Sequence, residues 1–394
     1  MFQDDFNVNC QPKRTYYTMG SKTPRRKFIE TLGKSTLAAT GISTLAACKP
    51  DDLKKQIEIP NINFNNTYRW KMTTTWPPNF PVVGEGCKMM TDWVRKMSGG
   101  RMEITVYGGG ELIPALEGFD AVSNGAVEMN HGAAYYWAGK VPAAQFFAAV
   151  PFGLNAQQMG AWIIAGGGQA LWEKLYEPYQ LKPIICGNTG VQMGGWFNKE
   201  INSVADLKGL KMRIPGLGGK VLAKAGGTPV LVSGGEIYTN LERGVIDATE
   251  WIGPYHDYIM GFHQVAQYYY YPGWHEPGPV LEMIINKPKF EALPTDLQEI
   301  VQTACLRLNR WMMAEFDAKN GEYLTKLIKE ENVNLKAFPD QVIQNLKGYA
   351  DEAISELCDA DGKSKEVFDA MMAFKAKTKD WVNVSEKYFY NHLY

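Results

Sequence analysis

Strand and helix patterns alternate along this chain, and their order constrains its fold more than any other feature. We expect strands over 68–76 and 102–107, of which the second alternates polar and apolar residues, and a helix over 82–97, whose apolar residues recur at helical spacing. A helix over about 114–124 and a strand over 126–129 follow. Alternating elements of this size predict a parallel-type sheet with helices on both faces. The expected fold class is therefore α/β.

A second series of the same kind lies further along the chain. Gly125 and Gly244 take equivalent places in the two series, each between a short helix and a strand, where a left-handed glycine would end the helix. Two similarly wound lobes would explain this repeat, although any α/β chain contains such units. The second series consists of a strand over 210–214, a helix over 218–225, a strand over 228–232, a helix over 235–243 and a strand over 245–251.

From Thr295 the pattern becomes helical for most of the remaining chain. Thr295 and Gln298 form a capping-box sequence, and the helical periodicity continues to about Glu331. Unbroken, this helix would be ~50 Å long at ~1.5 Å per residue, which is enough to cross two lobes. Another helix is expected from Asp340. A last helix carries an apolar stripe within 367–388, which packs either on its own body or on a partner subunit in a homodimer.

The first 66 residues read as an export leader and a tether. A basic front, an apolar middle and a small-residue exit before Cys48 are typical of a secretory signal. Arg25-Arg26 fits a twin-arginine signal, and the sequence LAAC that ends at Cys48 resembles a bacterial lipoprotein signal. Residues 1–47 would then be upstream sequence and cleaved signal, and a lipid on Cys48 would anchor the protein outside the cytoplasm. The polar stretch 48–66 would be the tether; a buried N-terminal helix is the alternative.

Composition argues against a nucleic-acid partner, a later membrane span and a cysteine metal site. Lys plus Arg number 41 and Asp plus Glu number 42, so the chain lacks the basic excess that favours nucleic acid. No segment after the leader has ~18 uninterrupted apolar residues, so the sequence predicts no later membrane span. The four cysteines beyond Cys48 show no metal-binding spacing, and we expect them to be free and buried. They are Cys87, Cys186, Cys305 and Cys358.

Sequence signatures of catalysis are absent. The chain has no Gly-x-Ser-x-Gly elbow, no His-Glu-x-x-His and no Cys-x-x-Cys. The glycines of 216–220 resemble a phosphate loop, but Val221 stands where a serine or threonine would hold magnesium, and the spacing differs. The five histidines are scattered. We therefore expect a protein that is not an enzyme and has no organic cofactor.

Three segments carry polar residues at positions suited to a ligand. Arg213 points away from the apolar face of its strand just before Pro215, and an arginine at a strand end suits bidentate capture of a carboxylate. Glu250 and Trp251 end another strand, and ligands of open α/β sheets gather outside the carboxyl ends of strands. Gln192 lies among glycines that permit close approach of the backbone. Taken singly, each suits an ordinary solvated or capping role as well.

Longer motifs around these residues resemble the solute-binding proteins of tripartite ATP-independent periplasmic (TRAP) transporters, and most closely the branch that binds α-keto acids and related monocarboxylates. The resemblance runs from about Trp70 to the C-terminus. The motifs are NTGVQMGGWF at 188–197, DLKGLKMRIPG at 206–216 and GEIYTNLERGVIDATEW at 235–251. The family implies a two-lobed, periplasmic-binding-protein-like fold. Its expected parts are lobe I at 67–188, lobe II at 189–278, and a returning strand, a long spanning helix and C-terminal helices in 279–394.

The resemblance also implies the roles of single residues. Arg213 would grip the carboxylate of a small organic acid. A cation beside it would be bound by the Gln192 amide, the Glu250 carboxylate and the Trp251 backbone carbonyl. A substrate carboxylate would repel Glu250 in a closed, poorly hydrated cleft, and a hard cation with oxygen ligands removes this conflict. Sodium or calcium would serve.

Four aromatic or acidic side chains complete the expected site. Tyr136 follows a strand of lobe I and could donate its hydroxyl to the ligand. Trp251 and Trp274 could form apolar walls. Glu276 is a weaker candidate for the cation or for a hinge.

The resemblance therefore predicts an extracytoplasmic receptor that captures a 2-oxo or 2-hydroxy monocarboxylate by closure of two lobes and delivers it to a membrane permease. The alternatives are an exported enzyme acting on organic acids and a TRAP receptor for a different solute. A ferric-ion protein using residues 268–271 is a weaker alternative, because consecutive strand residues point to opposite faces. A lipid anchor and a twin-arginine leader would be unusual in this family, whose members are usually free in the periplasm.

Overall fold

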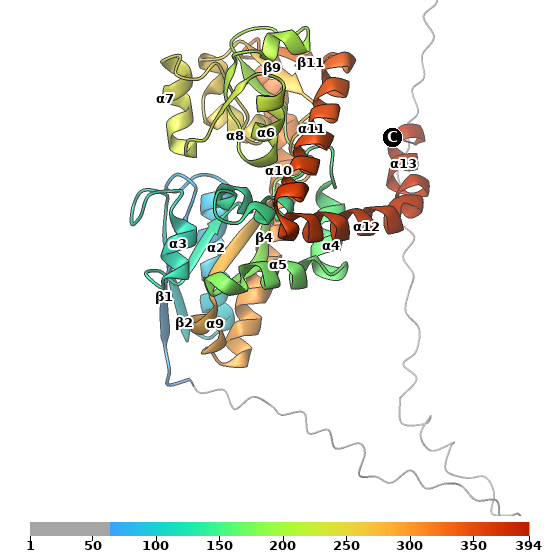
Figure 1. Cartoon of the computed structure of the whole chain (residues 1–394). Coiled ribbons are helices and arrows are strands. Elements are labelled where there is room, and N and C mark those ends of the chain that lie inside the picture. Colours follow the sequence, from blue (N-terminus) through green and yellow to red (C-terminus); the bar gives the residue numbers. More distant parts are fainter. Residues whose placement is uncertain (1–63, 394) are drawn as a thin grey trace, which may run out of the picture. The chain divides into compact units, whose positions relative to one another are not determined.

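Two β-sheets organise residues 64–393, the part of the chain that the computed structural model describes (Figure 1). These residues belong to one unit that spans 60–394. The first sheet has five strands in the order β2-β1-β3-β10-β4, and the second has six in the order β11-β9-β5-β8-β6-β7. Helices pack on both sheets, so the predicted α/β class is confirmed. The predicted leader, Cys48 and all but the last residues of the tether lie outside the described residues.

The first sheet combines parallel and antiparallel strands. β1 (Tyr68–Thr74) pairs in parallel with β2 (Met102–Tyr107) and β3 (Met129–Gly132). In contrast, β10 (Val280–Asn286) runs antiparallel to β3 and to β4 (Leu181–Asn188). Every residue of β10 is buried, as expected of a central strand covered on both faces. The predicted parallel arrangement thus holds for the first three strands, whereas the returning strand β10 is antiparallel.

β3 begins three residues later than predicted, because the end of the preceding helix occupies the chain. This helix, α3 (Gly118–Ser123), continues its hydrogen bonding beyond Gly125: the N–H groups of 126 and 127 both donate to the Ala121 carbonyl. Groups that finish a helix in this way cannot join a strand ladder. Gly125 has a φ of 78° and Gly244 a φ of 67°, so both glycines adopt the left-handed conformation that the sequence predicts.

The second sheet is also mixed. β6 pairs in parallel with β7 and β8, β9 pairs in parallel with β11, and β5 is antiparallel to β8 and β9. β8 has only two residues, whereas the predicted strand ran over 245–251. It is shorter because the N–H groups of 245 and 246 donate to the Asn240 carbonyl at the end of α7 (Ile237–Glu242). The chain leaves the sheet before Glu250, beside the end of β6. The strands are β5 (Gly195–Phe197), β6 (Lys211–Arg213), β7 (Thr228–Val230), β8 (Ala248–Thr249), β9 (Tyr268–Tyr271) and β11 (Asn334–Ala337).

Short helices cover the two sheets. Five of them, α2, α3, α4, α5 and α9, contact strands of the first sheet, whereas α6 and α7 contact strands of the second. These helical layers bury the apolar faces of the strands. The bounds not yet given are α2 (Val83–Met97), α4 (Ala156–Ala165), α5 (Gly168–Tyr176), α6 (Gly216–Lys224), α8 (Pro254–Ile259) and α9 (Lys287–Glu291).

One long helix, α10 (Thr295–Lys329), packs on β4 of the first sheet, on α2 and on α8. Its 35 residues span ~52 Å at ~1.5 Å per residue. The predicted long helix is therefore confirmed, but its predicted capping box is wrong. Pro294 precedes the helix and no side chain caps it. The Gln298 amide donates instead to the Leu293 carbonyl at 2.9 Å.

Three helices complete the chain. α11 (Asp340–Ala360) packs on α6, α12 (Gly362–Val384) packs on the 3-10 helix Pro142–Phe147, and α13 (Glu386–His392) packs on α12. The single last helix that we expected is broken at Ser385, whose φ of −105° and ψ of −110° are not helical. Figure 1 shows α13 at the far end of α12, where the chain ends.

The four cysteines of the described residues are free, as predicted. Cys87, Cys186 and Cys305 are buried, whereas Cys358 is partly exposed, so the prediction of burial is wrong for Cys358 alone. Burial raises the pKa of the Cys186 thiol well above its ordinary value, and hydrogen bonding with Cys305 adds to this effect. Thiols held protonated in a core are unreactive.

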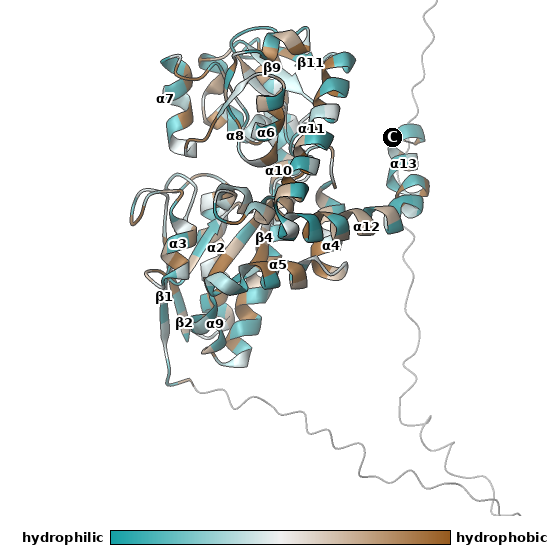
Figure 2. Ribbon diagram, in the orientation of Figure 1, coloured by the Kyte–Doolittle hydropathy of each residue, from teal (hydrophilic) through white to brown (hydrophobic). Residues whose placement is uncertain are grey.

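A carboxyl group lies in the middle of the first sheet. Figure 2 shows hydrophobic residues, in brown, along the strands of this sheet, yet Glu282 on β10 is fully buried among them. Glu282 accepts hydrogen bonds from the Trp137 indole and, at 3.3 Å, from the Tyr176 hydroxyl, and its second oxygen has no partner in the part of the chain that the structure describes. Burial raises the pKa of Glu282 to about 8, although the two hydrogen bonds oppose the rise. This carboxyl is therefore mainly protonated below about pH 8.

The buried Glu282 makes stability depend on pH. In the unfolded chain a glutamate titrates near ~4.3, so between about pH 4 and pH 8 the folded state keeps a proton that the unfolded chain has lost. The stabilisation of the folded state by this proton is therefore lost as pH rises through this range, and it is gone above about pH 8. We expect Glu282→Gln to flatten the dependence, with a melting temperature that falls by roughly 2 °C less than the wild type's between pH 5 and pH 9. Differential scanning calorimetry measures this difference. The exposed Glu242→Gln is the control, and equal falls in all three proteins would contradict the prediction.

Candidate functional site

A buried arginine lies at the carboxyl end of β6. Arg213 is 1% exposed and pairs in register with Thr249 on β8, so Glu250 follows directly beside it. The guanidinium forms an ion pair with the Glu250 carboxylate, and its Nη1 also donates to the Glu250 backbone carbonyl at 3.3 Å. Nη2 donates to the Tyr136 hydroxyl at 3.2 Å, and Nε has no partner among the described residues. The solvated strand arginine considered above is thus excluded.

Aromatic rings surround this guanidinium. The Arg213 guanidinium carbon lies 5.2 Å from the centre of the Trp251 ring, a cation–π distance. The Trp76 ring contacts both Tyr136 and Trp251 edge to face, with 6.5 Å and 6.3 Å between ring centres. Sequence reasoning missed Trp76 as a site residue. Its place as the last residue of the first predicted strand was the signal that could have found it, because ligands gather at the carboxyl ends of such strands.

Further polar side chains gather near the Glu250 carboxylate. One atom from each of Glu250, His275 and Glu276 lies within 4.8 Å of the others, and His275 Nε2 is 3.4 Å from Glu250 Oε2. Gln192 lies beside this group because its backbone N–H donates to the Glu276 backbone carbonyl at 3.2 Å. All four side chains are buried. The structure therefore brings together three residues predicted as cation ligands, Gln192, Glu250 and Glu276, and adds His275, which sequence reasoning left among the scattered histidines.

The charges in this cluster are unequally stabilised. Burial raises the pKa of Glu276 well above its ordinary value and the charge of Glu250 adds to the rise, while Arg213 and Tyr135 oppose it. Burial disfavours the charge of Arg213, but Glu250, Tyr136 and Tyr135 together outweigh burial and raise the arginine pKa. Burial likewise raises the pKa of Tyr136, which stays a neutral phenol. The site thus contains a fixed positive charge, one partnered carboxylate and a second carboxyl that resists ionisation.

The donor atoms of the cluster fit a hard cation. Gln192 Oε1 and Glu276 Oε2 are buried and have no hydrogen-bond partner among the described residues. An orphaned buried oxygen is costly unless a ligand or ion satisfies it. Sodium and calcium take amide, carboxylate and backbone carbonyl oxygens of this kind. Gln192, Glu250, Glu276 and the Trp251 carbonyl could therefore hold such an ion, whose charge would let a second anion enter beside Glu250.

Within residues 64–393, the Trp274 ring does not contact the Arg213 guanidinium. Its ring stacks on Phe152, with 6.0 Å between centres, and lies edge-on to His275 at 5.3 Å. The Trp274 carbonyl also accepts the Phe152 N–H at 2.9 Å. Trp274 thus supports the segment that carries His275 and Glu276 rather than contacting Arg213.

Three of the four adjacent tyrosines of β9 have separate partners. The Tyr269 hydroxyl donates to the buried Asp257 at 2.7 Å, whereas the Tyr270 hydroxyl accepts the Ile201 N–H at 2.8 Å. Tyr268 lies beneath the Lys336 ammonium group. The tyrosines do not converge on one point, as the alternation of strand side chains predicts, and this argues against a ferric-ion site.

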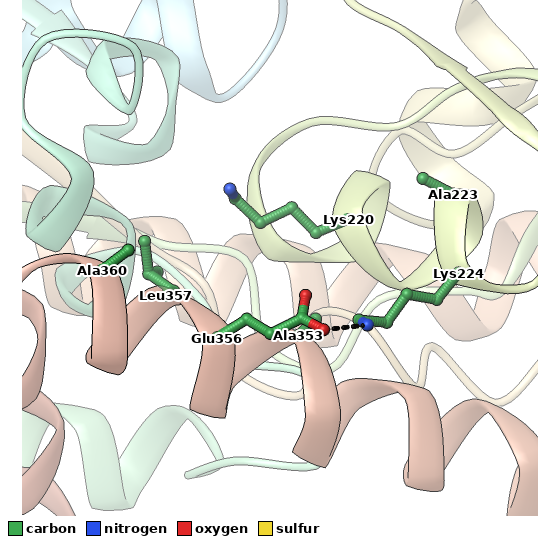
Figure 3. Close-up of a pocket in the computed structure, with 7 residues that line it drawn as sticks. All are labelled: Lys220, Ala223, Lys224, Ala353, Glu356, Leu357 and Ala360. Atoms are coloured by element: carbon green, nitrogen blue, oxygen red, sulfur yellow. Dashed lines mark hydrogen bonds and ion pairs between the residues drawn. The ribbon is translucent and has the colours of Figure 1, made fainter.

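A surface pocket of about 460 Å³ lies between α6 and α11, apart from these residues (Figure 3). Lys224 and Glu356 face each other in it at 2.7 Å, so its main charges neutralise one another. Lys220, the last residue of the glycine-rich segment, reaches over the same pocket (Figure 3). None of the predicted site residues lines it. The pocket therefore does not compete with the Arg213 cluster as a candidate site.

Comparison with known proteins identifies relatives of the chain. Residues 72–361 match the family model of the bacterial extracellular solute-binding proteins, family 7 (DctP). A monocarboxylate 2-oxoacid-binding periplasmic protein from Nostoc sp. strain PCC 7120 is 42% identical over 354 residues, which cover 90% of this chain and 95% of that protein.

Two solved structures are similar over most of the chain. The TRAP periplasmic solute-binding protein of Pseudoalteromonas atlantica T6c, with bound sodium and pyruvate, is 40% identical with a TM-score of 0.81, and the match covers 84% of this chain and 100% of that one. A TRAP solute-binding protein from Bordetella bronchiseptica RB50 is also 40% identical with a TM-score of 0.81, over 83% and 97% of the two chains. That protein is a mixed-occupancy dimer with copurified calcium and picolinate in one active site and the other site apo.

Proposed function

The chain belongs to the bacterial extracellular solute-binding proteins of family 7, and we propose that it is a TRAP transporter receptor that binds a 2-oxo or 2-hydroxy monocarboxylate together with sodium or calcium. The observation that carries this proposal is the buried Arg213, next to Glu250 and to the unpartnered oxygens of Gln192 and Glu276. A guanidinium beside oxygen donors suits an anion and a hard cation bound side by side. Members of this family are solute receptors, which favours binding without catalysis.

The ligands of the two similar structures share a chemical feature that narrows the substrate class. Pyruvate and picolinate each carry a carboxylate next to an atom with a lone pair, the 2-oxo oxygen in one and the pyridine nitrogen in the other. Each can therefore chelate a single cation through two atoms. A 2-oxo or 2-hydroxy acid has this arrangement, whereas a simple fatty acid of the same length lacks it.

The ion pair between Arg213 and Glu250 suggests how ligand and cation enter together. Both Nη1 contacts of the guanidinium go to Glu250, so a substrate carboxylate that bonds Nη1 and Nη2 together must displace Glu250 from Nη1. Glu250 would then be a buried carboxylate beside a second anion, which is strongly unfavourable without a positive charge. A cation held by Gln192, Glu250, Glu276 and the Trp251 carbonyl supplies that charge. We infer that the acid exchanges places with Glu250 on the arginine and that the cation stabilises the released carboxylate.

Calorimetry of ligand-free protein tests the proposal against its alternatives. Pyruvate should bind one to one in calcium or sodium buffer, and propionate, which lacks the 2-oxo oxygen, should bind at least about tenfold more weakly. The pyruvate should be recovered unchanged by NMR after hours with the protein. Consumption of pyruvate would indicate an exported enzyme, and no binding of any 2-oxo or 2-hydroxy acid would indicate a receptor for another solute.

The predicted two lobes supply the motion that a receptor needs. We propose that the first sheet with its helices corresponds to lobe I (67–188) and the second to lobe II (189–278), with the strands and helices of 279–394 joining them. Tyr136 from the first and Arg213 from the second meet across this division. Closure of the lobes would remove water from the guanidinium, where charged hydrogen bonds contribute more than in water. The closed receptor would then deliver its ligand to the TRAP membrane permease.

The family is periplasmic, and within residues 64–393 no helix is both long and apolar enough to cross a bilayer. We propose that a lipid on Cys48 anchors the receptor to a membrane after export by the twin-arginine leader. The protein should therefore sediment with membranes, and Cys48→Ala should release most of it to the periplasmic fraction. A wild-type protein that is already found mainly in the periplasmic fraction would contradict the anchor.

We propose that the C-terminal helices bind a second copy of the chain. In the apolar stripe within 367–388, Val367 and Met371 are buried, but the Trp381 side chain is 69% and the Tyr388 side chain 53% exposed. Such exposed aromatic rings are typical of an interface, and the similar Bordetella protein is a dimer. Light scattering should therefore show a homodimer that the double variant Trp381→Glu/Tyr388→Glu converts to a monomer. Leu306 on α10 is also exposed, and Leu306→Glu should leave the protein a dimer. A monomeric wild type would contradict the proposal.

A further inference from the structure

Trp76 packs against both aromatic side chains that contact the Arg213 guanidinium within residues 64–393. It follows β1 and is only 2% exposed. Its ring touches the rings of Tyr136 and Trp251, and these two side chains contact the guanidinium. The three rings come from separate parts of the chain. Trp76 therefore lies directly behind the aromatic contacts of the arginine.

A two-step hydrogen-bond chain fixes the orientation of the Trp76 ring. The indole N–H donates to His131 Nδ1 at 2.7 Å, and His131 Nε2 lies 3.3 Å from the Cys186 backbone carbonyl. A carbonyl can only accept, so the proton sits on Nε2 and Nδ1 is left free to accept from the indole. His131 is fully buried, and burial lowers its pKa to about 4, which the Cys186 carbonyl only partly offsets. The imidazole is thus neutral near pH 7, as this pattern requires.

The backbone of Trp76 is held as firmly as its ring. The Trp76 carbonyl accepts the Gly109 N–H at 2.7 Å and the Thr74 hydroxyl at 3.2 Å. A Cβ at Gly109 would lie 2.8 Å from the Ala115 Cβ and 3.2 Å from the Trp76 carbonyl, so only glycine fits this approach. The backbone carbonyl and the indole N–H of Trp76 are both hydrogen-bonded, so the ring cannot swing aside for a bulkier ligand without breaking buried hydrogen bonds.

Resting on the proposed function, we propose that Trp76 selects the acid by the size of its side chain and that His131 is the positioning residue that holds it. An acid with its carboxylate on Arg213 and its 2-oxo oxygen on the cation has only its remaining carbon chain free to meet the rings. Tyr136 and Trp251 already contact the guanidinium, and Trp76 is a ring that packs on both of them, where it can limit that chain. A large ring fixed in place discriminates by steric fit more sharply than a mobile one.

The ratio of affinities for a short and a long 2-oxo acid tests this inference. We would measure the dissociation constants of pyruvate and 4-methyl-2-oxopentanoate by calorimetry for the wild type and for Trp76→Leu, with calcium present. The wild type should prefer pyruvate, and Trp76→Leu should shift the ratio toward the longer acid by about tenfold or more, since a single methylene in a tight pocket can change affinity that much. The ratio is insensitive to partial unfolding, because an inactive fraction affects both acids equally.

Three further variants separate selection from general damage. Trp162→Leu removes an equally buried tryptophan that stacks on Phe147 and should leave the ratio unchanged. His131→Leu should shift the ratio in the same direction as Trp76→Leu, and His131→Gln, which keeps an acceptor and a donor, should restore the wild-type ratio. An unchanged ratio in folded Trp76→Leu would overturn the role of Trp76, and an unchanged ratio in His131→Leu would overturn that of His131. A wild type that binds neither acid would instead refute the proposed function.

Discussion

Replacing Arg213 with alanine should weaken the binding of pyruvate by at least about a hundredfold. The guanidinium is the positive group aimed at the predicted carboxylate position, and it is buried with its charge secured by Glu250. Removing one partner of a buried, hydrogen-bonded charge pair costs roughly 2–5 kcal/mol, because the other charge stays unpaired. Here the substrate carboxylate and Glu250 would both be left without the arginine. Calorimetric titration with pyruvate measures the loss.

Two variants keep this prediction specific. Arg213→Lys retains the charge but loses the planar fork that bonds both carboxylate oxygens, so its affinity should lie between those of the wild type and the alanine variant. Arg243→Ala removes an exposed arginine at the end of α7 and should bind pyruvate normally. Thermal melting shows whether Arg213→Ala is folded. A folded Arg213→Ala protein with unchanged affinity would remove Arg213 from the site.

Removing the cation should be nearly as damaging. In a buffer that contains a chelator and choline in place of sodium, the affinity for pyruvate should fall by about a hundredfold or more, because the acid would then enter next to Glu250 with no charge to balance it. Glu250→Gln should make pyruvate binding much less dependent on calcium or sodium, since the repulsion that the cation relieves is gone. Gln192→Ala should raise the cation concentration needed for binding. Calorimetry at graded calcium concentrations measures both effects.

Reciprocity gives this prediction an internal check. If calcium raises the affinity for pyruvate by some factor, pyruvate must raise the affinity for calcium by the same factor. The exposed Glu299→Gln should show the wild-type factor in both directions. Metal-free protein that binds pyruvate with full affinity would contradict the shared site.

Local sequence patterns predicted most of the fold because the elements are locally encoded. The helices at Val83–Met97 and Thr295–Lys329 carry long periodic patterns, and their bounds agree with the prediction to within about two residues. Boundaries failed where side chains and caps compete with regular structure, as at β3 and β8, whose expected first residues finish the preceding helices. The antiparallel strand β10 could not be predicted from its apolar run, because pairing direction depends on where the chain returns.

The candidate site was predictable only as a set of single residues. Arg213, Gln192 and Glu250 stood out because of strand ends, glycines and family motifs. The ion pair between Arg213 and Glu250 and the approach of His275 to Glu250 depend on register and on a long-range loop, which no local pattern records. Trp76 was missed because its contacts with Trp251 join segments 175 residues apart, although its place at the end of a predicted strand was visible in the sequence.

The most direct test of the central claim is a crystal structure of the protein with pyruvate and calcium, with the metal located by its anomalous scattering. We predict that the substrate carboxylate accepts two hydrogen bonds from the Arg213 guanidinium, and that Glu250 has left the arginine to coordinate the metal together with Gln192 and the Trp251 carbonyl. A structure in which Arg213 still pairs with Glu250, while pyruvate or calcium lies elsewhere, would contradict the account.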